Sequence, residues 1–248
     1  MLIAHATDLT GDDASALLHA VALARSSGSR LVTVYAGPDG ATLSPSPPEL
    51  AARWGRKIDH EFRRLEGGDE VADTVLESLR ELEPALVVVG THGRHGLAAL
   101  LRGSIGEAIV RNLDVPALVV PNRSRGFVDP RDGTLDLRRI VVPVGGAADA
   151  RRGMAAARQL LGMIGDPDAV VELVHVGPVD PELDRLGLVT TRVEGVLEEA
   201  ILDAVQARGA CMIVMPTRGH DGAGDVLRGS HTERVIHAAG CPVLAVPL

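Results

Sequence analysis

The stretch ALVVVGTHGRHGLAALLRGSIGEAIVRNLDVPALVVP, residues 85–121, places two short apolar runs on either side of a glycine-rich segment and a helical pattern. Residues 85–90 and 117–121 have the length and composition of buried strands, and residues 104–112 predict a helix between them. Fully apolar strands joined by helices are typical of a parallel sheet that is covered on both faces. The stretch therefore predicts an α/β fold.

The chain repeats this stretch in its second half, and the repeat is the strongest sign of its organisation. Residues 93–121 align without a gap on residues 219–247, at a constant offset of 126. Residues 1–10 match residues 138–147 at an offset of 137. The difference between the two offsets is accounted for if the second copy lacks most of the proline-rich stretch around residues 44–49. The chain therefore holds two copies of one fold.

A polar segment separates the two copies. Its sequence, NRSRGFVDPRDGTLD, is rich in glycine, proline and aspartate and is typical of a linker. We therefore expect an N-terminal domain over residues 1–122, a linker over residues 123–137 and a C-terminal domain over residues 138–248.

The first copy predicts further elements upstream of residue 85. Residues 2–7 predict a strand, and a helix follows it because apolar side chains recur at helical spacing at Ala14, Leu17, Leu18, Val21 and Ala24. Thr10 together with Asp13 predicts the start of this helix, and Gly28 its end. The other expected elements are a strand over 31–36, a short helix after the proline-rich stretch, a strand over 59–66 and a helix marked by Val71, Val75, Leu79 and Leu82.

The composition excludes several classes of protein. The chain has 248 residues, is 46% hydrophobic and carries a net charge of −8, with aromatic residues at 2%. A nucleic-acid-binding protein usually shows a basic face or stacking aromatics, and this chain has neither. Because there is no apolar run of membrane-spanning length and no secretion signal, we expect a soluble, cytoplasmic protein that does not bind membranes. Cys211 and Cys241 are expected to be reduced core thiols.

The glycine-rich segment is a candidate ligand site. In open parallel sheets, ligands bind beyond the carboxyl ends of strands, here after Thr7 and Asp8 and from Gly90 onward. Glycines let backbone N–H groups approach a ligand, and the helix that opens at Ser104 offers further donors to a phosphate. Purely structural roles remain open as well, because the glycines alone fit a turn equally well and Ser104 with Glu107 forms a capping box.

Three nucleotide-binding classes are excluded by the sequence. A P-loop and a phosphorelay receiver domain both require a lysine near the site, and the only lysine of the chain is Lys57. The dinucleotide pattern G-x-G-x-x-G is absent after the first strand.

The spacing G-x2-G-x9-G-S after the fourth strand resembles the ATP-binding motif of the universal stress protein family. The aspartate that closes the first strand and the Cys-Pro-Val-Leu of residues 241–244 strengthen the resemblance. It implies two tandem open parallel five-stranded sheets of order 3-2-1-4-5, with helices on both faces, like the adenine nucleotide alpha hydrolases. It also implies dimer-like contact through the last strands, either between the two halves of this chain or in a homodimer.

The resemblance also implies the nucleotide-binding residues. Asp8, beside Thr7, would face the adenine, Ala36 would offer a backbone contact, and Gly90 would lie beside the ribose. The phosphates would be held by Gly93, Gly103, Ser104 and Ile105. We add Arg94 and Arg102 for their charge, although both also fit as solvated arginines.

The second copy departs from this pattern at two positions. Gly145 stands in place of Asp8, and Pro216 stands in place of Gly90, which removes a carboxylate and a backbone donor. Gly219, Gly229 and Ser230 keep the rest of the motif. We therefore expect a competent nucleotide site in the N-terminal domain and a degenerate one in the C-terminal domain.

No pattern for catalysis is present in the sequence. No nucleophile lies at a supporting distance from a base, and His175 is expected to be structural. A metal site at His220, Asp221 and His231 is conceivable, but no known zinc spacing supports it, so we expect none. Mg²⁺ could accompany ATP through its phosphate oxygens.

The function expected from these features is stress response or signalling through bound ATP. Hydrolysis is expected to be very slow at most, with output through an unidentified protein partner. The alternative is a scaffold or interaction protein of the same fold that binds no nucleotide.

Overall fold

The computed structural model describes most of the chain. The described residues are 1–9, 13–66, 70–91, 105–122, 124, 126–165, 168–178, 181–185, 189–217 and 231–247. Of the expected site residues, Gly93, Arg94, Arg102, Gly103, Ser104, Gly219, Gly229 and Ser230 lie outside these ranges.

The elements of the N-terminal half follow the predicted alternation of strands and helices. They are β1 (Leu2–Thr7), α1 (Ala14–Ser27), β2 (Arg30–Ala36), α2 (Pro47–Arg53), β3 (His60–Leu65), α3 (Val71–Leu82), β4 (Leu86–Thr91), α4 (Ile105–Asn112) and β5 (Ala117–Pro121). Helix α1 ends at Gly28, whose φ of 64° is the left-handed conformation that a glycine C-cap adopts. Every strand and helix predicted for this half is therefore present.

The C-terminal half repeats this alternation. Its elements are β6 (Arg139–Pro143), α5 (Ala147–Ile164), β7 (Val170–Val176), α6 (Pro181–Arg185), β8 (Thr190–Val193), α7 (Leu197–Ala207), β9 (Met212–Thr217), α8 (His231–Ala238) and β10 (Val243–Pro247). Helix α5 ends at Gly165, the counterpart of Gly28 at the offset of 137, with a φ of 72°. The repeat in the sequence is therefore a repeat in the structure.

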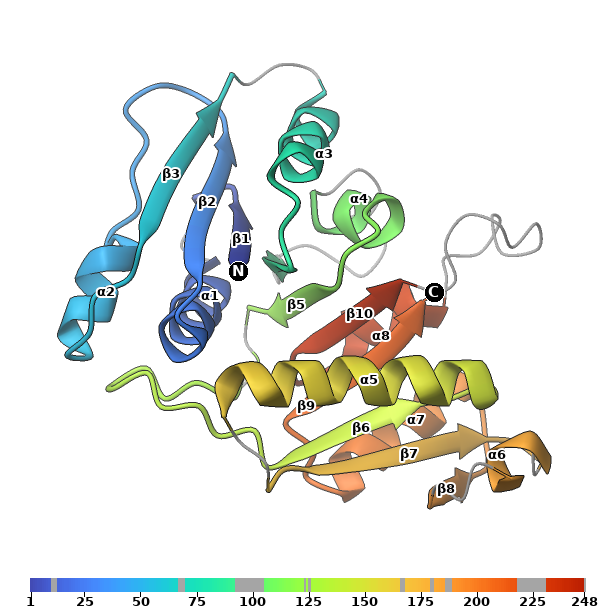
Figure 1. Cartoon of the computed structure of the whole chain (residues 1–248). Coiled ribbons are helices and arrows are strands. Elements are labelled where there is room, and N and C mark those ends of the chain that lie inside the picture. The colour runs from blue at the N-terminus through green and yellow to red at the C-terminus, as the bar shows by residue number, and fades with distance from the viewer. Residues whose placement is uncertain are drawn as a thin grey trace.

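All ten strands form one sheet, in the order β3-β2-β1-β4-β5-β10-β9-β6-β7-β8. Within each half the order is the expected 3-2-1-4-5 and the pairing is parallel. Strands β5 and β10 pair antiparallel, with Leu118 opposite Leu244, so the two five-stranded sheets join edge to edge. Figure 1 shows the blue-to-green half and the yellow-to-red half meeting at these two strands. The pairing lies within one chain.

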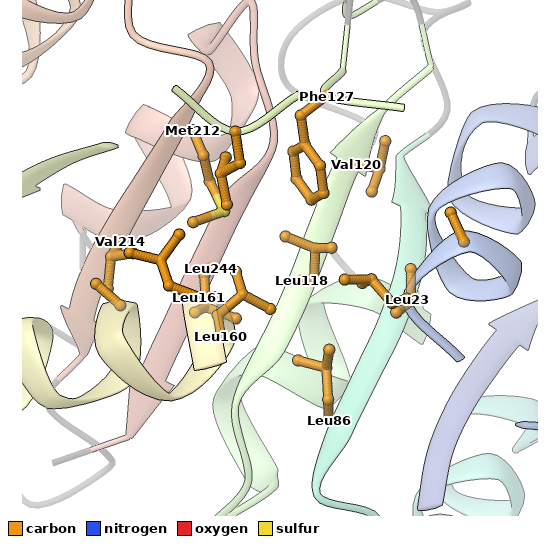
Figure 2. Close-up of a cluster of buried hydrophobic side chains, with 14 of the residues drawn as sticks. Leu23, Leu86, Leu118, Val120, Phe127, Leu160, Leu161, Met212, Val214 and Leu244 are labelled. Carbon is orange, nitrogen blue, oxygen red and sulfur yellow. The ribbon is translucent and has the colours of Figure 1, made fainter. Parts of the chain in front are cut away.

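Two hydrophobic layers cover the faces of this sheet. One layer contains α1, α2 and α5, and the other contains α3, α4, α7 and α8, as their buried side chains show. Both layers run across the junction of the halves. In the first layer, Leu118 of β5 and Leu244 of β10 belong to the same cluster as Leu23 of α1 and Leu160 of α5 (Figure 2).

The segment between the halves is packed against the N-terminal half. Phe127 and Leu137 are buried in the first layer, and a single bridge pairs Val128 with Leu135. The guanidinium of Arg25 in α1 donates hydrogen bonds to the carbonyls of Asp132 and Gly133. The expected linker is therefore a folded strap whose apolar residues belong to the core.

Candidate functional site

The carboxyl ends of β1, β2 and β4 meet at one edge of the N-terminal half. Strand β1 pairs in parallel with both neighbours, which sets Thr7 beside Tyr35 and Ala6 beside Val89. The first turn of α4 lies against the end of β4, because a Cβ at Gly106 would be 3.9 Å from the carbonyl oxygen of Gly90. We call this edge the N-terminal mouth. It brings together the described site residues Thr7, Asp8, Ala36, Gly90 and Ile105.

The chain turns sharply where β1 ends at this mouth. Leu9 has a φ of 60°, a left-handed conformation that is uncommon for a residue with a side chain. Its backbone N–H donates a 2.9 Å hydrogen bond to the hydroxyl of Thr7, which is buried. Thr7 therefore fixes the turn that presents Asp8, which is partly exposed.

A buried imidazole and carboxylate lie beneath the mouth. Nε2 of His5 in β1 is 2.9 Å from Oδ2 of Asp13, and the two side chains are 0% and 8% exposed. Both of these atoms, and Nδ1 of His5, are buried and have no hydrogen-bond partner among the residues that the structure describes. The imidazole and the carboxylate therefore lie close together without the geometry of a hydrogen bond.

Of the predicted start signal of α1, Thr10 lies outside the described residues, and Asp13 has another role than capping. Asp13 is the N-cap residue of the helix, but its side chain makes no capping hydrogen bond. The carboxylate lies over Gly90 instead. A Cβ at Gly90 would come well inside 3.0 Å of Asp13 Oδ1 and 3.5 Å from the Cβ of Ala16. A side chain at Gly90 would therefore force the Asp13 carboxylate or the strand to move, whatever Gly90 does for a ligand.

Sequence reasoning missed the pair of His5 and Asp13. The available signal was a histidine in the middle of an otherwise apolar strand, LIAHAT. A buried histidine needs a partner, so this residue pointed to a polar neighbour. The pattern does not say which neighbour, because that depends on how α1 lies over β1.

At the equivalent edge of the C-terminal half, apolar residues stand in place of the polar pair and of Gly90. At the offsets of the repeat, Val142 corresponds to His5, Ala150 to Asp13 and Pro216 to Gly90. A Cβ at Gly153, the counterpart of Ala16, would come 3.3 Å from the ring of Pro216 and closer still to Val142. The proline ring and the valine therefore fill the space that the polar pair occupies in the first half.

The loop after β6 also differs from its counterpart after β1. The backbone N–H of Gly145, which stands in place of Asp8, donates a 2.9 Å hydrogen bond to Oδ2 of Asp149. This carboxylate caps the turn from within the chain. The two expected departures of the second copy belong to neighbouring strands, because Gly145 follows β6, Pro216 lies in β9, and these strands pair in parallel.

Several other polar groups are bound within the protein. His175 lies 2.9 Å from the carbonyl of Val144 and 2.7 Å from that of Pro178, which supports its predicted structural role. His231 Nδ1 is 2.7 Å from Glu198 Oε1. Across the described ranges, no cluster of three histidine, cysteine or acidic residues could hold a metal ion. Residues 220 and 221 of the conceivable metal group lie outside those ranges.

The cysteines and the helices bear on the predictions made from composition. Cys211 and Cys241 are both free, and burial raises the pKa of the Cys241 thiol to about 12. In the described part of the chain, no helix has the length and apolar character needed to cross a bilayer.

Comparison with known proteins gives the family. The model of the universal stress protein family matches residues 2–121 and 182–247. A curated universal stress protein, MJ0531 of Methanocaldococcus jannaschii, is 32% identical over 90 residues, which are 36% of this chain and 51% of that protein. The match thus spans about half the length of this relative.

Solved structures share the whole fold. A universal stress protein from Archaeoglobus fulgidus superposes with a TM-score of 0.72 at 17% identity, over 99% of this chain and 96% of its own. A functionally unknown protein from Pseudomonas aeruginosa PAO1 gives 0.71 at 15% identity, over 99% and 92%. The fold and the family model agree with the resemblance in the motif, and the chain belongs to the universal stress protein family.

Proposed function

We propose that the N-terminal half binds ATP at its mouth and that the protein acts in stress response or signalling through this nucleotide. The carrying observation is the contrast between the two mouths. The N-terminal mouth combines Asp8 with Gly90, while the equivalent positions of the C-terminal half hold Gly145 and Pro216. The first mouth therefore keeps the carboxylate of Asp8 and the backbone N–H of Gly90, and the second lacks both at the matching positions.

The arrangement of elements supports a phosphate beside α4. This helix has eight residues and begins at Ile105 beside the end of β4. The first N–H groups of a helix lack partners within it and carry the positive end of its dipole. An anionic phosphate is favoured there, and Gly93, Gly103, Ser104 and the arginines at 94 and 102 are proposed to complete its cradle. Mg²⁺ would then bind through the phosphate oxygens.

The C-terminal mouth is proposed to bind nucleotide weakly or not at all. Pro216 has no backbone N–H to offer, and its ring packs toward Gly153. Asp149 already accepts the hydrogen bond of the Gly145 amide, so this backbone donor is not available to a ligand. We therefore assign one nucleotide to each chain.

We assign no catalytic residue. Hydrolysis is proposed to be very slow at most, so the bound nucleotide serves as a signal that an unidentified protein partner detects. A cytoplasmic location, where ATP is plentiful, fits this role.

The test is to identify and titrate the ligand. Small molecules extracted from the purified protein should include an adenine nucleotide, and calorimetric titration with ATP should give close to one site per chain. Gly103→Val should abolish binding, because it places a side chain in the proposed cradle. The matched change in the second half, Gly229→Val, should leave binding intact.

The opposite results would contradict the proposal. Binding that survives Gly103→Val but is lost in Gly229→Val would move the site to the C-terminal half. A protein that neither retains nor binds an adenine nucleotide would favour the alternative function, a scaffold of the same fold.

A further inference from the structure

The pair of His5 and Asp13 is not needed by the fold. The C-terminal half builds the same architecture with Val142 and Ala150 at these two positions, and both are fully buried. Replacing a buried pair of polar side chains by apolar residues of suitable volume is often neutral or stabilising. The N-terminal half therefore keeps a polar pair where its own repeat shows that an apolar core suffices.

The carboxylate of this pair lies beside the end of β4, which forms part of the mouth. Asp13 Oδ1 lies against Gly90 at the end of β4, while Oδ2 approaches His5. The side chain is more than nine-tenths buried, it does not cap α1, and its Oδ2 has no hydrogen-bond partner. Because Oδ2 is set against His5, Oδ1 beside Gly90 is the oxygen of this carboxylate that a ligand at the mouth could reach.

The chemistry of a carboxylate limits what can meet it here. It accepts hydrogen bonds and cannot donate them, so its ligand must supply a hydroxyl or an amino group. Phosphate oxygens would be repelled by its charge. In a nucleotide, only the sugar hydroxyls and the exocyclic amino group of the base qualify.

The order of the strands decides between the sugar hydroxyls and the amino group of the base. This step rests on the proposed function, in which the phosphates bind beside α4. The mouth runs from β2 through β1 to β4, and α4 follows β4. If the phosphates lie at the start of α4, the sugar that is bonded to them lies beside β4 and the base lies toward β2. Asp13 lies over Gly90 of β4, and thus on the sugar side.

We propose that Asp13 determines specificity for the sugar by accepting a hydrogen bond from a 2′ or 3′ hydroxyl of the bound nucleotide. His5 is a positioning residue that holds the carboxylate over Gly90 from beneath. The site therefore selects ribonucleotides over nucleotides that lack these hydroxyls.

The test compares ATP with 2′,3′-dideoxy-ATP on the full-length protein. A hydrogen bond to a charged acceptor contributes enough that the wild type should bind ATP about 10- to 100-fold more tightly. The double variant His5→Val/Asp13→Ala copies the residues of the C-terminal half and leaves no lone buried charge. It should bind the two nucleotides equally, whereas Asp149→Asn, in the corresponding turn of the other half, should keep the preference.

Further variants separate binding from folding. Asp13→Asn keeps the shape but makes the acceptor neutral, and should reduce the preference at least several-fold. His5→Gln keeps a donor near the carboxylate and should retain more of the preference than His5→Val. Thermal unfolding identifies any variant at positions 5 and 13 that has lost the fold. The preference for ATP over 2′,3′-dideoxy-ATP is then compared among the variants that remain folded.

Three results would overturn the inference. The first is equal binding of ATP and 2′,3′-dideoxy-ATP by the wild type. The second is an unchanged preference for ATP in the double variant and in Asp13→Asn. A third is a loss of discrimination between ATP and inosine triphosphate in place of the sugar preference, which would put the base on Asp13. In these three cases ATP still binds and the proposed function stands, whereas no binding of any nucleotide would contradict both.

Discussion

The residue type tolerated at position 90 depends on a side chain that is distant in the sequence but close in space. The carboxylate of Asp13 occupies the space of a Cβ at this residue. We predict that Gly90→Ala lowers the free energy of unfolding by about 1–3 kcal/mol, because the added methyl group forces the carboxylate or the strand to move. Gly106→Ala is the control, since its Cβ would find ordinary contacts at 3.7–3.9 Å and alanine favours a helix. Urea unfolding of both variants checks this, and equal stabilities would contradict the packing argument.

His19 is a second residue whose environment sets a measurable property. It is 2% exposed, and burial lowers its pKa from 6.5 to about 4. Its Nδ1 lies 2.7 Å from the carbonyl of Ser15, and its Nε2 accepts a hydrogen bond from the N–H of Phe127. The neutral ring satisfies both contacts, with the proton on Nδ1, and a second proton on Nε2 would break the contact with Phe127.

The lowered pKa of His19 predicts a loss of stability in mild acid. As the pH falls below 6.5, the unfolded chain takes up a proton that the folded protein binds only near pH 4. The contribution to the free energy of unfolding is therefore complete above pH 6.5 and falls by about 3 kcal/mol between pH 6.5 and 4. His19→Gln should show a shallower pH dependence in urea unfolding over this range. Parallel curves for the two proteins would mean that His19 is not the group responsible.

At the scale of elements, the sequence predicts strands and helices well where burial is complete. Strands β1 and β5 have the predicted bounds because both faces of a parallel sheet are covered, which leaves a continuous apolar run. What the sequence did not predict depends on contacts between elements. The contact of His5 with Asp13 is set by the position of α1 over β1, and no local pattern carries it.

The strap between the halves was predicted as a polar linker for a similar reason. Its composition is dominated by charged residues and glycine and gives no sign that Phe127, Val128 and Leu137 are buried. The glycines also have a structural reason that composition does not show. Gly133 has a φ of 68°, and a Cβ there would collide with the ring of Trp54.

We predict that Arg25 holds this strap in place. Its guanidinium donates to the carbonyls of Asp132 and Gly133 and lies 5.3 Å from the centre of the Trp54 ring. Arg25→Met should lower the free energy of unfolding by about 1–2 kcal/mol and speed amide exchange in residues 129–134. Arg131→Met should do neither, since Arg131 is exposed and pairs with Asp129 within the same turn. Equal effects of the two changes in hydrogen-exchange mass spectrometry would contradict this assignment.

At the scale of the whole molecule, the two halves share one sheet and both of its hydrophobic layers. Leu118 pairs with Leu244 across the junction, and Arg111 of α4 forms an ion pair of 2.5 Å with Glu233 of α8. Phe127 of the strap lies in the same layer as Met212 of β9 (Figure 2). Unfolding of one half would therefore expose the apolar edge strand of the other half and the hydrophobic residues that the two halves share.

We predict that the halves unfold together. Leu79 of α3 is fully buried in the N-terminal half, and Leu79→Ala should lower the free energy of unfolding by about 2–5 kcal/mol. If unfolding is cooperative across the junction, the slowest-exchanging amides of β7 and β9 lose the same protection as those of β1 and β4. Hydrogen exchange followed by mass spectrometry measures both sets in one sample, and Trp54 fluorescence gives the transition of the N-terminal half. Protection that falls in β1 and β4 but persists in β7 and β9 would show two independent units, with the β5–β10 junction contributing little to their stability.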